Sequence, residues 1–176
     1  MSELRCFIIG PNGSGKTTVG RMLANFLSLK FLDSDLEVEN KSGEDIVNFW
    51  RKTGIEAFSQ FEATVFNSLT AKKNIVLATS VHSIYKLENR HLLNERGKTI
   101  YLATNPVNQY TRSMLSKRQS LMLVDVNNKL KYLIELSKTM EPIYNSIADF
   151  VVATDNCSVE EIVNKIIDYL YCGVYC

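Results

Sequence analysis

A phosphate-binding motif lies near the start of the chain. Residues 10–17, Gly-Pro-Asn-Gly-Ser-Gly-Lys-Thr, match the pattern G-x-x-x-x-G-K-[ST] in full. Its glycines allow the backbone to curl, so that successive N–H groups can point at phosphate oxygens. In this pattern the ammonium of Lys16 reaches the β- and γ-phosphates, and the hydroxyl of Thr17 is a ligand of Mg²⁺. The motif therefore predicts a site for ATP and magnesium.

The context of the motif favours this interpretation over a glycine-rich turn without a ligand. A short apolar run, which predicts a buried strand, precedes the loop, and a helix with apolar residues at helical spacing follows it. The positive end of that helix would add to the attraction for phosphate. We expect the nucleotide to be bound by the loop and the first residues of the helix: Gly10, Asn12, Gly13, Ser14, Gly15, Lys16, Thr17 and Thr18.

Two carboxylates follow the second predicted strand. Asp33 and Asp35 come directly after the apolar pair 31–32. Because parallel strands present their carboxyl ends at one edge of a sheet, we expect both carboxylates beside the phosphate loop. There they can hold a magnesium-bound water and accept a proton from an attacking hydroxyl. The alternative is that one of them caps the helix beginning near Leu36.

The elements that position these groups alternate between strand and helix. Short apolar runs predict five strands, within residues 4–9, 31–32, 74–79, 99–103 and 150–152. Helical spacing predicts helices at 16–29, 36–69 with breaks near 41–43 and 53–54, from 105 onward, 128–147 and 158–170. This alternation is typical of an α/β fold with a parallel sheet. Without a repeat or a proline-rich linker, the 176 residues predict a single domain.

Composition excludes several classes of partner. A formal net charge of +1 provides no basis for binding nucleic acid or an anionic membrane. No apolar run reaches the roughly 20 residues of a membrane-spanning helix, and no signal peptide precedes the phosphate loop. We therefore expect a cytoplasmic protein, a monomer, with its four cysteines as reduced thiols. Cys6, within an apolar run, is predicted to be a buried small hydrophobe.

Beyond these motifs, the sequence resembles the shikimate kinases, small P-loop kinases of the aromatic amino-acid pathway. The resemblance spans nearly the whole chain and includes the phosphate loop with Thr-Val-Gly-Arg at 18–21, Phe-Leu-Asp-Ser-Asp at 31–35, Gly-Ile-Glu-Ala-Phe at 54–58 with Glu62, and Glu-Pro-Ile-Tyr at 141–144. It implies a three-layer fold with a five-stranded parallel sheet, a helical substrate subdomain at about 34–62 and a lid at about 113–126.

The resemblance also implies roles for individual residues. The γ-phosphate of ATP would pass to a hydroxyl of a small acceptor in the presence of Mg²⁺. Asp35 would bind and polarise that hydroxyl and Asp33 would order a magnesium water, while Lys16 and Arg118 of the lid would balance the developing charge. Arg112 corresponds to a position of the family that packs on the adenine.

The chain departs from the family's pattern on the acceptor side. Ser59 and Met140 stand where the family has two arginines that bind the shikimate carboxylate, and Ser-Val-His at 80–82 replaces three glycines. The lid has Gln-Ser-Leu-Met at 119–122 in place of Arg-Pro-Leu-Leu, with Arg118 one residue early. His82 follows the third strand, where a ligand contact and a structural role both remain open.

Two hypotheses fit these residues. One is an ATP- and magnesium-dependent kinase, whose acceptor is either shikimate bound by substitute residues or another small molecule, with shikimate a poor acceptor. The other is a non-catalytic relative that binds nucleotide and signals to a partner through lid closure.

Overall fold

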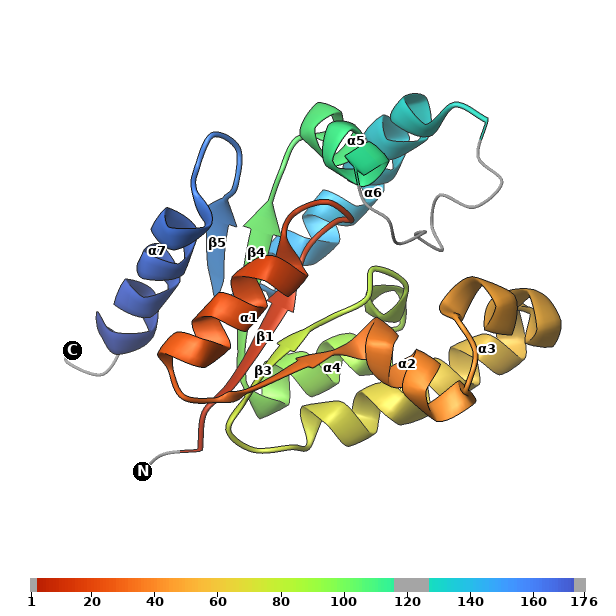
Figure 1. The fold of residues 1–176 in the computed structure, drawn as a ribbon, viewed down its shortest axis with the longest axis horizontal. Helices are drawn as coiled ribbons and strands as arrows, with labels where there is room; N and C mark the ends of the chain where they lie inside the picture. Colours follow the sequence, from red (N-terminus) through yellow and green to blue (C-terminus); the bar gives the residue numbers. More distant parts are fainter. Residues whose placement is uncertain (1–2, 116–126, 173–176) are drawn as a thin grey trace.

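The computed structural model describes residues 3–115 and 127–172. Its centre is a five-stranded sheet in the order β2-β3-β1-β4-β5, and every neighbouring pair is parallel. The strands are β1 (Arg5–Ile9), β2 (Lys30–Asp33), β3 (Ile75–Ala78), β4 (Lys98–Ala103) and β5 (Phe150–Ala153). The predicted α/β fold and parallel sheet are confirmed, and the carboxyl ends of all five strands lie at one edge (Figure 1).

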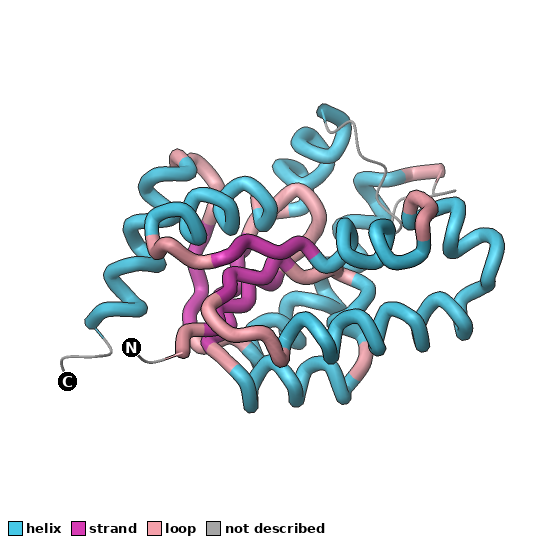
Figure 2. The backbone as a smooth tube through the Cα atoms, turned by 60° about the horizontal axis from the view of Figure 1, so that its bottom comes forward, coloured by secondary structure: helices cyan, strands magenta, loops and turns pink. Residues whose placement is uncertain are grey.

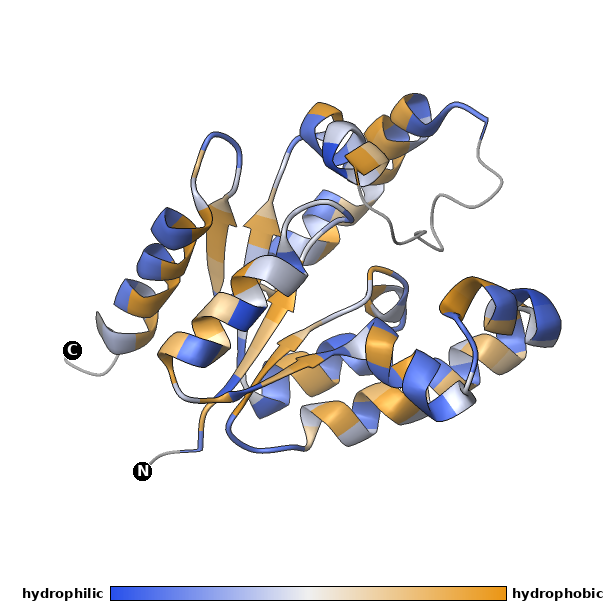
Figure 3. Ribbon diagram, viewed as in Figure 1, coloured by the Kyte–Doolittle hydropathy of each residue, from blue (hydrophilic) through white to orange (hydrophobic). Residues whose placement is uncertain are grey.

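Helices cover both faces of the sheet, so that the strands lie between two helical layers (Figure 2). On one side are α1 (Lys16–Phe26) and α7 (Val159–Cys172). On the other are α3 (Ile46–Thr70), α4 (Leu87–Arg96) and α6 (Lys129–Ile147). The side of α7 that faces β5 is apolar and its outer side is polar (Figure 3).

Alternation along β1 divides the core between these two layers. Phe7 and Ile9 belong to the cluster under α3, α4 and α6, whereas Cys6 and Ile8 belong to the cluster under α1 and α7. This follows from the two-residue period of a strand that is buried on both faces. Cys6 is therefore a buried hydrophobe, as predicted, and burial raises the pKa of its thiol to about 12.

Two predicted breaks in the segment after β2 are confirmed. The helix α2 (Ser34–Ser42) ends at Gly43, whose φ of 75° lies in the left-handed region. The long helix α3 bends at Gly54, whose φ is 80°. At these two positions the backbone adopts a conformation that costs glycine little and other residues more.

The other helix ends match the ends expected from the sequence at some positions and differ at others. The capping box of α7 is present, since Ser158 and Glu161 exchange side chain-to-backbone hydrogen bonds of 2.7 and 3.1 Å. The helix α5 (Pro106–Leu115) starts as predicted, but it includes residues 113–115, which the sequence had indicated as the start of the lid loop. The rest of that segment, 116–126, lies outside the described residues. A 3₁₀ helix, η1 (His82–Tyr85), was not predicted.

No helix within residues 3–115 and 127–172 combines the length and the hydrophobicity needed to cross a membrane.

Candidate active site

The loop between β1 and α1 has the backbone shape that binds phosphate. Gly10, Gly13 and Gly15 have φ values of 141°, 78° and 94°. A Cβ atom on Gly10 would lie 2.6 Å from a backbone oxygen of β4, and one on Gly13 would lie 3.0 Å from a backbone oxygen of α5. No side chain caps the N-terminus of α1. The loop therefore keeps room and backbone donors for an anion at the start of a helix.

Two side chains of the loop also fit an anionic ligand. Ser14 is 1% exposed, and its Oγ has no hydrogen-bond partner among the described residues. The Nζ of Lys16 donates to the carbonyls of Gly10 and Pro11 at 2.7 and 2.9 Å. Burial lowers the pKa of Lys16 to about 8, although the carboxylates of Asp35 and Asp33 favour its charged form. A phosphate would provide both groups with a stronger partner.

The predicted magnesium ligands are in direct contact. Thr17 Oγ1 donates to Asp33 Oδ2 at 2.8 Å. The other oxygen, Asp33 Oδ1, accepts from the backbone N–H groups of Asp35 and Leu36 at 3.1 and 3.3 Å and so caps α2. The capping role of Asp33 is therefore observed on Oδ1, while its role at magnesium stays a prediction for Oδ2. A hydroxyl and a carboxylate are hard oxygen ligands of the kind that Mg²⁺ uses, with water completing its octahedron.

The remaining predicted residues lie at different places around this centre. Asp35 is half-buried in the first turn of α2, two residues beyond the capping residue Asp33. Thr18 is exposed on α1. Arg118 lies outside the described residues. The part of the chain that the structure describes contains no cluster of three or more histidines, cysteines or acidic residues suited to a metal.

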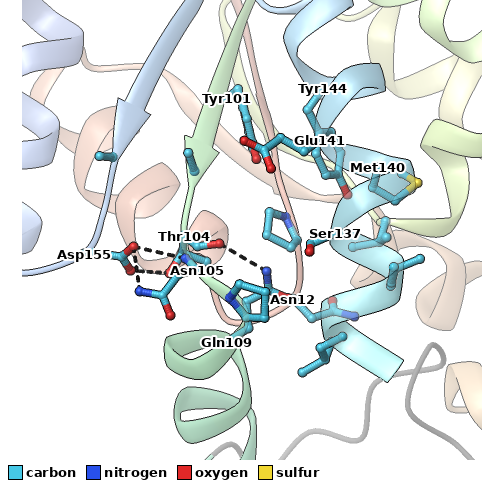
Figure 4. A pocket seen from close by; sticks show the side chains of 17 residues that line it. Asn12, Tyr101, Thr104, Asn105, Gln109, Ser137, Met140, Glu141, Tyr144 and Asp155 are labelled. Atoms are coloured by element: carbon cyan, nitrogen blue, oxygen red, sulfur yellow. Dashed lines mark hydrogen bonds between the residues drawn. The ribbon is translucent and has the colours of Figure 1, made fainter. Parts of the chain in front are cut away.

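Arg112 connects α5 to the nucleotide side of the loop. Its guanidinium donates to the carbonyl of Gly13 at 3.2 Å and to Thr154 at 3.0 and 3.1 Å. Next to it, the Asp155 carboxylate accepts hydrogen bonds from the side chains of Thr104, Asn105 and Asn108 and from the backbone of Asn105. Figure 4 shows Asp155 beside Thr104 and Asn105. Burial alone would raise the pKa of Asp155, but these donors lower it overall. Sequence reasoning missed Asp155, because its partners are about fifty residues away in the chain.

A cavity of about 300 Å³ lies beside the phosphate loop (Figure 4). Pro11 and Asn12 form part of its wall, and Val81, Met140 and Tyr144 form others. Thus two of the positions that are expected to depart from the family's pattern, 81 and 140, line one cavity together with polar residues. Its lining includes Glu141 and Asp155 but not Lys16, Asp33 or Asp35, the residues for which the sequence predicts phosphate chemistry.

The other positions that are expected to depart from the family's pattern lie on α3 and after β3. Ser59 is half-buried, and its carbonyl accepts a hydrogen bond of 2.7 Å from Lys86 Nζ. Ser80 Oγ and His82 Nδ1 contact the two oxygens of Glu62 at 2.6 and 2.7 Å. No short sequence signal predicted this cluster, whose members are 18 and 20 residues apart.

Comparison with known proteins agrees with this architecture. The family model described as shikimate kinase matches residues 12–171. The chain is 38% identical over 171 residues to a shikimate kinase of Histophilus somni, covering 97% of each, and 41% identical to one of Shewanella loihica, covering 97% of this chain and 99% of the other. The structure of a shikimate kinase from Acinetobacter baumannii in complex with shikimate superposes with a TM-score of 0.90 at 35% identity, over 97% of this chain and 94% of that one. The chain therefore belongs to the shikimate kinase family, whose members are phosphotransferases with an alcohol acceptor.

Proposed function

We propose that the protein transfers the γ-phosphate of ATP to a hydroxyl of shikimate. The observation that carries the proposal is the contact between Thr17 and Asp33 inside a complete phosphate loop, with a second carboxylate, Asp35, two residues further on. Membership of the shikimate kinase family supports the choice of acceptor.

Each residue has a role that follows from its position. The backbone of the loop and Lys16 bind the β- and γ-phosphates, and Lys16 leaves the carbonyls of Gly10 and Pro11 to do so. Thr17 and Asp33 hold Mg²⁺, which when bound neutralises phosphate charge. Asp35 accepts the hydrogen of the attacking hydroxyl and holds its oxygen in line with the phosphate.

Other predicted parts of the site belong to the same proposal. Arg112 packs on the adenine, and Arg118, in the segment predicted to be the lid, meets the transferring phosphate. The substrate subdomain at 34–62 receives the acceptor, and the protein acts as a monomer in the cytoplasm.

The acceptor is held more weakly than the phosphates. Ser59 and Met140 have no charge, and Met140 is 2% exposed in an apolar setting. A hydrogen bond to a charged group contributes about 1.5–3 kcal/mol, so that two missing arginines remove roughly 3–6 kcal/mol of binding. At about 1.4 kcal/mol per tenfold, the loss is about a hundredfold or more. We therefore propose a kinase that phosphorylates shikimate poorly, with a high KM.

A second function, nucleotide binding without catalysis, is favoured by the apolar wall that Val81 and Met140 form beside the phosphate loop. Such a protein would bind ATP and change conformation, but it would phosphorylate no acceptor.

A coupled assay of ADP release separates the two. We expect release that rises with shikimate concentration up to tens of millimolar and that the substitution Asp35→Asn removes. ADP binding without any shikimate-dependent release would favour the second function. Failure to bind ADP–Mg²⁺ at all would contradict both.

A further inference from the structure

A buried carboxylate next to the acceptor side has two unusual partners. Glu62, on α3, is 2% exposed. Its Oε1 accepts a hydrogen bond from Ser80 Oγ at 2.6 Å, and its Oε2 lies 2.7 Å from His82 Nδ1. A buried carboxylate is costly unless its oxygens are paired. Because Glu62 occupies Nδ1, this nitrogen carries a hydrogen and donates it, and the orientation of the imidazole is fixed.

The same network reaches the proposed catalytic carboxylates. The backbone N–H of Ser80 donates to Ser34 Oγ at 2.6 Å, and Ser34 lies between Asp33 and Asp35. A chain of hydrogen bonds thus runs from the start of α2 through Ser80 and Glu62 to His82. The histidine is held at the same edge of the sheet as Asp35, on the side of β2 and β3.

The second ring nitrogen of His82 is available for a ligand. The side chain is 18% exposed. Its Nε2 has no hydrogen-bond partner among the described residues, and it is not one of their buried polar atoms that lack a partner. Nε2 is therefore open to solvent. The ring is also supported by Phe58, which it meets edge-on with centroids 5.3 Å apart.

We propose that His82, positioned by Glu62, binds the carboxylate of the acceptor through Nε2. This proposal rests on the proposed function and names a residue that balances part of the acceptor's negative charge. Since Nδ1 already donates to Glu62, a donor at Nε2 requires the imidazolium form. Glu62 lies against that cation, while Lys86 is bound to the carbonyl of Ser59. Tyr85, whose ring is 6.3 Å away, has a pKa raised by burial and stays neutral.

The test uses His82→Asn, because the amide nitrogen of asparagine can take the place of Nδ1 but nothing replaces Nε2. We expect the KM for shikimate to rise about tenfold or more, with kcat changed less than threefold and unfolding by urea unaltered. The exposed His91→Asn is the matched control and should leave KM unchanged. Glu62→Gln, which removes the charge that holds the ring, should also raise KM more than it lowers kcat.

An unchanged KM in His82→Asn, or a loss confined to kcat, would overturn the proposal. If the wild type shows no turnover, the proposed function fails, and calorimetric titration of shikimate into the ADP–Mg²⁺ complex decides the inference. Equal affinity in wild type and His82→Asn, or no binding to either, overturns it.

Discussion

Replacement of Lys16 by methionine should stabilise the nucleotide-free protein while it removes nucleotide binding. The lysine residue is half-buried, and its ammonium donates to two neutral carbonyls, those of Gly10 and Pro11. Lowering its pKa from 10.5 to about 8 corresponds to roughly 3 kcal/mol in favour of the neutral amine. Partial exposure and the two carbonyls reduce the cost of the charge, so we expect a gain of about 1–2 kcal/mol from Lys16→Met. For a protein of this size the gain raises Tm by about 2–8 °C.

The pH dependence of that gain has a definite sign. Below about pH 8 the amine is protonated in both the folded and the unfolded chain, so the cost is fully present at pH 7. Between about pH 8 and pH 10.5 the unfolded chain binds a proton that the folded chain does not, and the wild type becomes more stable as the pH rises. The difference between Lys16→Met and wild type should therefore shrink over this range.

Unfolding by urea, with and without ADP–Mg²⁺, measures both effects. Ligand at a hundred times its Kd stabilises the wild type by about 2.7 kcal/mol, but it should not stabilise Lys16→Met, so the order of stability reverses. The exposed Lys41→Met serves as the control for loss of a positive charge. If Lys16→Met were less stable than the wild type at pH 7 without nucleotide, or if the difference stayed constant to pH 10, the assignment of a buried, unfavourable charge would be wrong.

Three further outcomes are expected. Asp35→Asn should lower kcat about 10²–10⁴-fold with little change in ADP affinity measured by calorimetry; a normal kcat would exclude Asp35 as the base. Ser59→Arg with Met140→Arg should lower the KM for shikimate in the ADP-release assay, and an unchanged KM in the folded double variant would show that these positions do not face the acceptor. Gly13→Ala, at a φ of 78° and with its Cβ 3.0 Å from a backbone oxygen, should cost about 1–3 kcal/mol in urea unfolding; Gly43→Ala, at a φ of 75° with nothing within 4 Å, is the control and should cost less.

The parts of the fold that local chemistry encodes were predictable. The phosphate loop, the breaks at Gly43 and Gly54 and the capping box of α7 each depend on residues within a few positions of one another. The end of α5 was not predictable, because its last turn carries Met114 and Leu115, which are 60% and 81% exposed. Apolar residues on the outer side of a helix interrupt the pattern from which helices are inferred.

For the candidate site, the sequence predicts residue types but not the contacts that these residues make. The sequence predicted Lys16, Thr17 and Asp33, yet it does not contain the information that Lys16 lies on the carbonyls of Gly10 and Pro11. Nor does it indicate that Asp33 divides its oxygens between Thr17 and the cap of α2. Such choices depend on the geometry of the sheet edge, where strands distant in sequence end side by side.

At positions 80–82, the side-chain contacts in the folded protein change how the expected loss of glycines is interpreted. From the sequence alone, Ser80 and His82 are expected to replace glycines of the family's pattern. In the folded protein, both side chains pair with the buried Glu62. Substituting glycine at both positions would remove these two hydrogen-bond partners of the Glu62 carboxylate, at a cost of about 1–3 kcal/mol or more. An arginine in place of Ser59, one helical turn before Glu62, would supply a compensating charge. The three positions are therefore coupled, and glycines at 80 and 82 without the arginine would destabilise the protein.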